Sequence, residues 1–398
     1  MRVAIVHDWL YTLGGAERVL RSILRCYPTA DVLTLFDLLP AEDRAWIGYD
    51  RSVTSFMQRL PGIAKRHRAY LPLMPLAIEQ LDLSGYDLVI SSSYAVAKGV
   101  LTGPDQVHVA YVHSPMRYAW DLQHQYLRES RLNRGLRGAL ARIVLSYMRI
   151  WDSRTAHGVT AFIANSAFIG RRIQKAYGRQ SEVIYPPVDV PVHRPEWVRG
   201  NHFLVASRLV TYKNVSAVVE AFAHLPGHQL IVAGTGPEEA RLRSIAGPNV
   251  TFVGFVTDAE LRRLMGTARA FIFAAEEDFG IIPVEAQGEG TPVLALGRGG
   301  VRETVITEGA GRTGMFFDEA APATIARTVQ CFLAIEDAFS PDASHAQALR
   351  FAASLFERRF TSFVENQMHS MQDSLDACRA SAPERRAGTV VPLAQAVV

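Results

Sequence analysis

Cysteine is scarce in this sequence of 398 residues, and so are long hydrophobic runs. Cys26, Cys331 and Cys378 lie far apart and match neither a disulfide framework nor the CxxC spacing of a metal site, so we expect buried free thiols. Apolar stretches such as 270–275 are far shorter than the roughly 18 to 20 residues that a membrane-spanning helix needs. The pattern therefore argues against an integral membrane protein.

Motifs of several common protein classes are also missing. The sequence contains neither a GxGxxG dinucleotide fingerprint nor a GxxxxGK[ST] phosphate loop. No zinc-finger spacing or RNP-type aromatic motif accompanies its basic residues. The first residues run directly into a strand pattern, with Asp8 where a secretory signal needs an apolar core. We therefore expect a cytoplasmic protein with no nucleic-acid partner.

The composition indicates a folded protein of about two domains. Hydrophobic residues make up 48% and charged residues 20% of the chain, close to globular averages. Short aliphatic runs alternate with helical patterns, which is typical of βαβ units around parallel sheets. Strands are expected at 2–7, 88–91, 107–112, 161–164, 202–206, 230–233, 250–253, 270–273 and 293–296, and helices at 16–26, 131–150 and 346–375.

A proline-rich segment, 185–195, interrupts the alternation and reads as a linker between domains. We predict an α/β protein in which two doubly wound, Rossmann-like domains face a central cleft. The expected parts are a first domain at 1–188, a linker at 189–200, a second domain at 201–350, a helix at 351–376 that packs back on the first domain, and a flexible tail at 377–398. Ligands in such sheets bind beyond the carboxyl ends of the strands.

Positive charge is concentrated in the first half. Residues 1–190 contain 23 Lys and Arg against 16 Asp and Glu, whereas the remainder contains 19 against 23. Lys65, Arg66 and Arg68 form one cluster beside aromatic and aliphatic residues, and a row of arginines follows between 128 and 142. Such clusters are either solvated helix faces or surfaces that bind anionic lipid headgroups.

Two loops after expected strands carry groups suited to an anionic ligand. Gly14 and Gly15 open a helix, where backbone N–H groups and the helix dipole can meet a phosphate or a sugar oxygen, although a tight turn alone would also explain them. Arg208 and Lys213 follow the first strand of the second half. These two cations lie where a diphosphate would sit and can offset the charge of a departing pyrophosphate.

A third loop lies between two glutamates with seven residues between them. Phe279, Gly280 and Ile281 present backbone N–H groups at a helix start, which suits an anion or a sugar hydroxyl. Glu285 can accept hydrogen bonds from a vicinal diol, and Glu277 from the hydroxyls of a second, distal sugar.

These motifs resemble a known family. The order of Gly14-Gly15, His113, Arg208 with Lys213, and Glu277 to Glu285 resembles the retaining glycosyltransferases of family 4 (group 1), which have the GT-B fold. The phrases HDWLYTLGGAERVL, YVHSPMRYAWD and FAAEEDFGIIPVEAQ are similar to the subgroup that assembles O-antigen and exopolysaccharide units, often as mannosyltransferases.

The resemblance implies roles for the donor site. Arg208 and Lys213 would hold the donor diphosphate, and Glu285 the ribose hydroxyls. Glu277, with the backbone of 279–281, would hold the transferred sugar. The loop containing Phe255 would meet the nucleobase.

The resemblance also implies a reaction. His113 would face the transferred sugar from across the cleft and position it, without acting as a general base, because the leaving phosphate assists the acceptor hydroxyl. Arg208 and Lys213 can supply a metal ion's electrostatic stabilisation, and no DxD motif stands at a suitable loop, so no metal and no cofactor are expected.

The implied activity moves mannose from GDP-mannose to a lipid-linked oligosaccharide with retention of configuration. Lys65, Arg66 and Arg68 would contact the acceptor or an anionic inner-membrane surface. A nucleotide-sugar 2-epimerase and an inactive binding protein of the same fold remain as alternatives.

Overall fold

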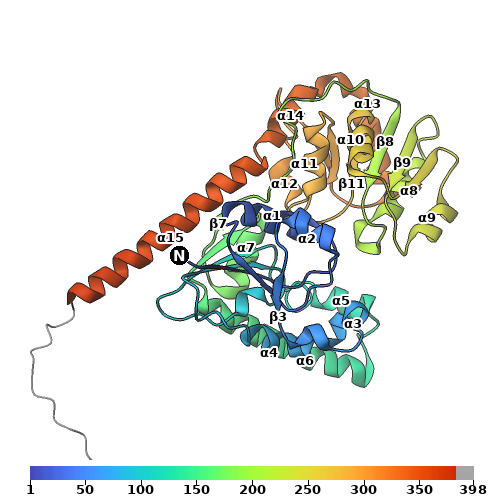
Figure 1. Ribbon diagram of the computed structural model, residues 1–398. Coiled ribbons are helices and arrows are strands. Elements are labelled where there is room, and N and C mark those ends of the chain that lie inside the picture. Colours follow the sequence, from blue (N-terminus) through green and yellow to red (C-terminus); the bar gives the residue numbers. More distant parts are fainter. Residues whose placement is uncertain (382–398) are drawn as a thin grey trace, which may run out of the picture.

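The computed structural model describes residues 1–381, with side chains described through residue 377 (Figure 1). The strands are β1 (Val3–His7), β2 (Asp31–Thr34), β3 (Ser52–Thr54), β4 (Leu88–Ser93), β5 (Val107–Val112), β6 (Ala161–Ala164), β7 (Glu182–Val183), β8 (His202–Ala206), β9 (Gln229–Ala233), β10 (Val250–Gly254), β11 (Phe271–Phe273), β12 (Val293–Leu296) and β13 (Gly314–Phe317). All nine strands expected from the sequence are present within about two residues, and β2, β3, β7 and β13 are additional.

The strands form two parallel sheets. The first has the order β3-β2-β1-β4-β5-β6-β7 and the second the order β10-β9-β8-β11-β12-β13. The strand order reverses between β1 and β4 in one sheet and between β8 and β11 in the other. Such reversals leave a crevice at the carboxyl ends of the strands, where ligands bind in folds of this kind. The predicted α/β fold with two Rossmann-like domains is confirmed.

The helices are α1 (Gly15–Cys26), α2 (Ala41–Ile47), α3 (Ile63–Arg66), α4 (Met74–Glu79), α5 (Gln123–Glu129), α6 (Gly135–Thr155), α7 (Ala167–Tyr177), α8 (Val215–Phe222), α9 (Glu239–Ile245), α10 (Asp258–Thr267), α11 (Ile281–Gly288), α12 (Val301–Thr304), α13 (Pro322–Ala334), α14 (Pro341–Leu349) and α15 (Ala353–Ser381). α6 begins at Gly135 rather than at the predicted residue 131, because Arg131 has a positive φ angle that a right-handed helix does not contain.

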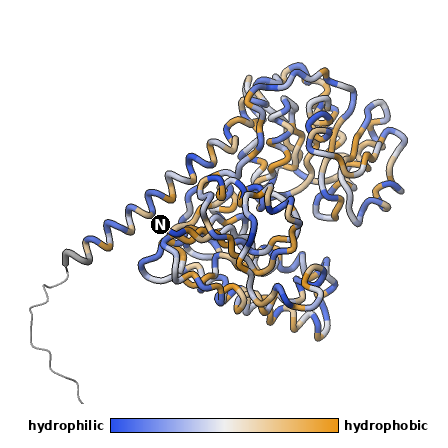
Figure 2. Tube along the Cα trace, in the orientation of Figure 1, coloured by the Kyte–Doolittle hydropathy of each residue, from blue (hydrophilic) through white to orange (hydrophobic). Residues whose placement is uncertain are grey.

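Each sheet is buried on both faces. Along β1, Ala4 and Val6 belong to one hydrophobic cluster, and Val3 and Ile5 to another on the opposite face. The second sheet is divided in the same way between the clusters that contain Phe203 and its neighbour Leu204. Figure 2 shows the hydrophobic segments gathered in the two sheets. Rigid sheets of this kind fix the positions of the loops that follow their strands.

The chain returns to the first domain at its end. Phe356, Phe360 and Val364 of α15 are buried in the cluster that contains β1 and α1, and α15 runs along this domain in Figure 1. The one helix predicted over 346–375 is in fact two, α14 and α15. The break occurs because the Phe351 carbonyl accepts a hydrogen bond of 2.9 Å from the Val188 N–H.

Two further expectations need correction. The tail predicted at 377–398 begins too early, since α15 continues to Ser381, and residues 382–398 lie outside the described part. Cys26 is partly buried, but Cys331 is exposed because α13 turns Val329 and Phe332 toward the core instead. The side chain of Cys378 lies outside the description. Among the described residues, no helix has the length and apolar character to cross a membrane.

Candidate active site

A cleft of about 1390 Å³ lies between the carboxyl ends of the two sheets. Residues from both domains line it. Those predicted for the catalytic and donor sites are Gly14, Gly15 and His113 of the first domain and Arg208, Lys213, Glu277, Phe279, Gly280 and Ile281 of the second. The structure therefore brings most of the predicted donor site together on opposite walls of one cleft.

Glu277 and Lys213 form an ion pair on the wall of the second domain. A glycine loop supports Glu277 from behind: Gly299 pairs with it as an isolated bridge, and the Gly300 N–H donates to the Glu277 carbonyl at 2.9 Å. A Cβ atom at either glycine would come within 2.3 Å of backbone oxygen. Glycine is therefore needed at both positions because the backbone of this loop packs closely against the backbone of the cleft loop.

The start of α11 presents backbone to the cleft. Gly280 precedes the helix with a φ of 85°, a conformation that favours glycine. The Phe279 ring is buried between Tyr185 and Phe351, with ring centroids 5.6 and 5.5 Å away, so Phe279 contributes its backbone to the lining. Unpaired N–H groups at a helix start attract anions and hydroxyl oxygens.

Lys213 is mostly buried, at the end of the turn that follows β8. Burial, and then the positive charge of Arg117, lower the pKa of Lys213 to about 8. Asn214 follows with a positive φ and donates a hydrogen bond of 2.9 Å to the Ala274 carbonyl, which ties this turn to the strand that leads to Glu277. Arg208 lies on the same wall but is exposed, so its guanidinium can reach a ligand without a large desolvation cost.

His113 directly follows β5 and is held by a buried polar chain. The Ser92 hydroxyl lies 2.8 Å from its Nε2 and 3.1 Å from Nδ1 of His7, and the other ring nitrogen of His7 lies 3.4 Å from the Glu17 carboxylate. Asn165 donates to the His113 carbonyl at 2.9 Å. Burial, and then the charge of His7, lower the pKa of His113 to about 3, so this imidazole is neutral near pH 7.

Two arginines that the sequence analysis did not single out reach across the cleft. Arg117 and Arg172 of the first domain both pair with Asp278 of the second, and the Ser166 hydroxyl donates to the Asp278 carbonyl at 2.6 Å. Arg117 and Asp278 are in the phrases YVHSPMRYAWD and FAAEEDFGIIPVEAQ, whereas Arg172 is in neither, and a sequence does not reveal which arginine faces which carboxylate. These contacts hold the two domains together beside Glu277.

Glu285, predicted to hold the ribose, is not among the residues that line the cleft. Its carboxylate pairs with Arg18 of α1 and lines a separate cavity of about 210 Å³ between the domains. Glu285 is four residues beyond Ile281 and so lies one turn farther along the same side of α11. Arg18, which pairs with it, lines both the cleft and the smaller cavity. The hydroxyl groups of a ribose can donate hydrogen bonds to this carboxylate only if Arg18 moves away or if both bind it at the same time.

The other predicted residues also lie at the margins of the cleft or beyond it. Phe255 is 82% exposed and is absent from the cleft lining. Lys65 and Arg66 are exposed on α3, whereas Arg68 lines the first-domain side of the cleft. This basic cluster therefore begins on the outer surface and ends at the mouth of the cleft.

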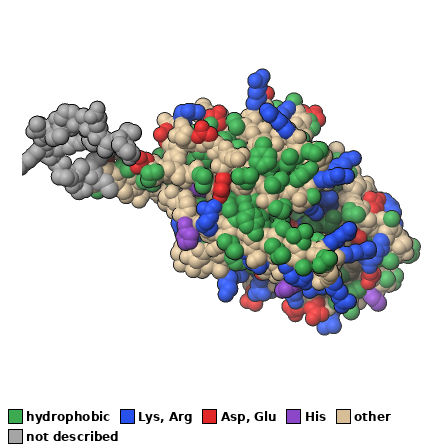
Figure 3. Space-filling view, turned by 90° about the horizontal axis from the view of Figure 1, so that it is seen from below, with side chains coloured by type: hydrophobic (Ala, Val, Ile, Leu, Met, Phe, Trp, Pro, Cys, Tyr) green, Lys and Arg blue, Asp and Glu red, His purple; other side chains and the backbone are tan. Residues whose placement is uncertain are grey.

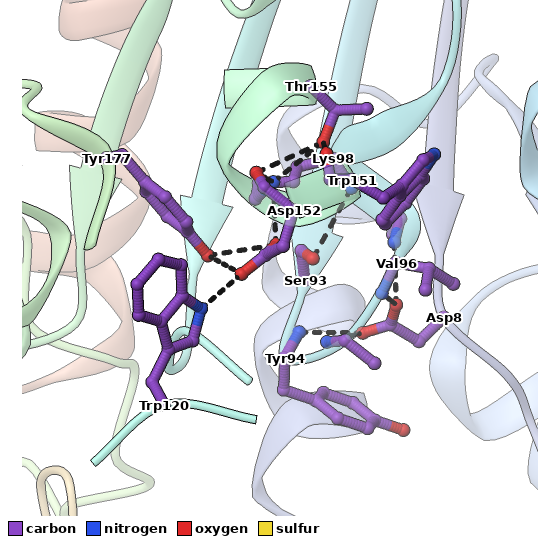
Figure 4. A network of polar contacts seen from close by, with 12 residues as sticks. Asp8, Ser93, Tyr94, Val96, Lys98, Trp120, Trp151, Asp152, Thr155 and Tyr177 are labelled. Atoms are coloured by element: carbon purple, nitrogen blue, oxygen red, sulfur yellow. Dashed lines mark hydrogen bonds and ion pairs between the residues drawn. The ribbon is translucent and has the colours of Figure 1, made fainter. Parts of the chain in front are cut away.

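A second polar network fixes the loop that follows β4 (Figure 4). The Asp8 carboxylate, at the end of β1, accepts four hydrogen bonds of 2.6 to 2.9 Å from the backbone of 94–97. Nearby, Lys98 and Asp152 form a buried ion pair of 2.8 Å, and Trp120 and Tyr177 donate to the same carboxylate. Sequence reasoning missed this network, because its members are spread over β1, β4, α6 and α7.

The residues of the cleft wall do not form a metal centre: among the residues that the structure describes, no three His, Cys, Asp or Glu side chains are grouped to hold an ion. The cleft offers cations that can bind phosphate and carboxylates that can bind hydroxyl groups, with the neutral imidazole of His113 on the opposite wall.

Together the two sheets, their order and the cleft between them define the GT-B fold of glycosyltransferases. HepE from Anabaena, in complex with UDP-glucose, superimposes with a TM-score of 0.66 at 20% identity, over 92% of this chain and 100% of that one. Sucrose-phosphate synthase from Thermosynechococcus elongatus superimposes with a TM-score of 0.68 at 14% identity, over 93% and 100%. At these identities the likeness shows the fold alone.

Family models match both halves of the chain. The glycosyltransferase family 4 model covers residues 13–191, and the glycosyl transferases group 1 model covers residues 195–346. The chain therefore belongs with the family 4/group 1 glycosyltransferases, as the resemblance in its motifs indicated.

Curated relatives match over shorter segments. D-inositol 3-phosphate glycosyltransferase from Mycobacterium marinum is 32% identical over 152 residues, which is 32% of this chain and 32% of the relative. A GDP-mannose-dependent monoacylated alpha-(1-6)-phosphatidylinositol monomannoside mannosyltransferase from Corynebacterium glutamicum is 32% identical over 114 residues, 25% of this chain and 30% of the relative. The chain thus matches about a third of the length of these relatives.

Proposed function

We propose that this protein is a retaining glycosyltransferase that transfers a sugar from a nucleoside diphosphate donor to a lipid-linked saccharide. One observation carries the proposal: Arg208, Lys213 and Glu277 line one wall of the cleft and His113 the other. The cations suit a departing diphosphate and the carboxylate suits sugar hydroxyls, while the neutral imidazole can position the sugar between the walls. The reaction uses no metal ion and no cofactor beyond the nucleotide sugar.

GDP-mannose is the first candidate donor. The resemblance of the chain's motifs to O-antigen and exopolysaccharide mannosyltransferases supports this candidate. The relative from Corynebacterium glutamicum is named as a GDP-mannose-dependent mannosyltransferase. A uridine nucleotide is the second candidate, because the HepE structures contain UDP or UDP-glucose. The acceptor belongs to the assembly of a bacterial surface polysaccharide and is held at the inner face of the plasma membrane, which the exposed Lys65, Arg66 and Arg68 contact.

The test is a calorimetric titration of the whole protein with GDP, UDP, ADP and NAD in the presence of a chelator. We expect micromolar binding of one nucleoside diphosphate, weakened in Glu285→Ala if the ribose reaches this carboxylate. Binding of NAD alone, or of none of the four, would show that the donor site is assigned wrongly. A requirement for added divalent metal would refute metal independence.

Product analysis then separates the transferase from the 2-epimerase. A transferase turns over a nucleotide sugar productively only with an acceptor and yields a glycosylated lipid with retained configuration. An epimerase converts the nucleotide sugar alone, with no acceptor present.

A further inference from the structure

Helix α6 exposes a row of large apolar side chains to solvent. The row consists of Leu136, Leu140, Ile143, Tyr147 and Ile150, each between 45% and 90% exposed. Their spacing of four and three residues places them along one side of the helix. Leu145, Met148 and Trp151 on another side are buried in the core of the first domain. We call this exposed row the α6 stripe. Its side chains do not contribute to the hydrophobic core of the domain.

The stripe belongs to a wider apolar surface. Leu73, just before α4, and Leu76 within it are also exposed. Figure 3 shows this side of the molecule from below, with hydrophobic side chains gathered over the face that carries α3, α4 and α6 in Figure 1. Contiguous exposed apolar surface on this scale marks a binding surface more often than chance exposure.

Positive charge lies on both sides of the stripe and just before the helix. Helical spacing places Arg137 and Arg142 on either side of it, and Arg134 immediately precedes the helix. The sequence of α6 contains one acidic residue, Asp152, which is buried against Lys98. The solvent side of α6 is thus apolar in its centre and cationic at its edges.

We propose that the α6 stripe docks into the headgroup region of an anionic phospholipid bilayer. Apolar side chains enter the boundary between headgroups and acyl chains, while flanking arginines extend to lipid phosphates, as in helices that lie in the membrane plane. The charge pattern argues against a second copy of this chain as the occupant. A two-fold contact through the stripe would bring the same arginines together without compensating carboxylates.

The position of the stripe connects the bilayer to the cleft. Leu140 of the stripe also lines the cleft, together with Arg137 of its edge and the apolar Leu132 and Val144. A docked α6 therefore places this apolar part of the lining at the membrane surface, in the same cleft that His113 lines. This inference deepens the proposed function and rests on it in one respect: a lipid-held acceptor would enter through this part of the cleft.

The docking is tested by flotation of the full chain with vesicles of phosphatidylcholine alone or mixed with phosphatidylglycerol. Leu136→Ser combined with Ile143→Ser removes two strongly exposed stripe residues that do not line the cleft. We expect wild type to float with the mixed vesicles and the double variant to lose affinity at least about ten-fold. Val192→Ser combined with Val198→Ser, at two exposed valines of the linker, is the matched control and should float like wild type.

Equal flotation of wild type and the stripe variant would overturn the inference. So would a wild-type dimer that the stripe variant makes monomeric, because the stripe would then bind a second copy. Calorimetry with the nucleoside diphosphate on the same proteins checks folding and separates the two proposals. Stripe-dependent flotation without nucleotide binding refutes only the donor site, and nucleotide binding without stripe-dependent flotation refutes only the docking.

Discussion

The Ser92 hydroxyl lies 2.8 Å from Nε2 of His113 and so fixes the orientation of this imidazole in the cleft. Because His113 is neutral near pH 7, one of its ring nitrogens carries a proton and the other does not. The Ser92 hydroxyl can donate to or accept from Nε2, so it holds the ring in place in either tautomer. Ser92 is therefore a positioning residue for the proposed reaction.

Replacing Ser92 with alanine should lower kcat by about 10- to 100-fold, because a small displacement of a positioning group costs rate more than affinity. The KM for the donor should change much less. Ser91→Ala is the matched control: Ser91 is the preceding residue of β4 and bonds to the buried His108 at 2.9 Å, away from the cleft. Equal losses of kcat in both variants would assign Ser92 a merely structural role.

Replacing Lys213 or Glu277 with alanine should abolish transfer while the protein stays folded. Loss of Lys213 removes a charged contact to the diphosphate, which is worth about 1.5 to 3 kcal/mol, so nucleotide affinity should fall by about 10- to 150-fold. Lys175→Ala, at an exposed lysine of α7, controls for the loss of one positive charge. Turnover retained in either cleft variant would count against the assigned donor site.

Nucleotide binding should weaken as the pH rises from 7 to 9. With a pKa of about 8 in the free protein, Lys213 is protonated in about nine-tenths of molecules at pH 7 and about one-tenth at pH 9. A bound diphosphate favours the charged form, so binding above pH 8 takes up a proton. Calorimetry in buffers of different ionisation enthalpy measures this uptake. A Lys213→Arg variant, which stays charged, should show none, and uptake that persists in it would have another source.

The strands and the loops of the cleft could be predicted well because both depend on patterns within short stretches of sequence. Buried parallel strands are short aliphatic runs, and the loop after each strand is adjacent to it in sequence. Lys213 and Glu277 could therefore be placed at the edge of one sheet. Their direct pairing depends on the register of β8 and β11, which no local pattern reveals.

The contacts that the sequence did not reveal have a different cause. The resemblance implied that Glu285 holds the ribose, but its pairing with Arg18 joins α11 to α1 of the other domain, which no local pattern indicates. The contact of Ser92 with His7 joins residues 85 apart in sequence, on the adjacent strands β4 and β1. Contacts of this kind follow from tertiary packing rather than from composition or periodicity.

The buried ion pair of Lys98 and Asp152 gives a prediction about stability. Both side chains are almost fully buried, and burial lowers the pKa of Lys98, so each charge depends on the other for compensation. Lys98→Met leaves the Asp152 carboxylate without its cation and should lower the free energy of unfolding by about 3 to 5 kcal/mol. Urea unfolding followed by the fluorescence of Trp120 and Trp151, which flank the pair, measures this loss.

A second substitution distinguishes an uncompensated charge from lost packing. Asp152→Asn added to Lys98→Met removes the orphaned charge but keeps an oxygen that can accept from Trp120 and Tyr177. The double variant should therefore be more stable than Lys98→Met alone, because a buried charge costs more than a buried neutral amide. If the two losses simply add in the double-mutant cycle, the pair contributes no coupling, and the stability of this region comes from packing around Lys98.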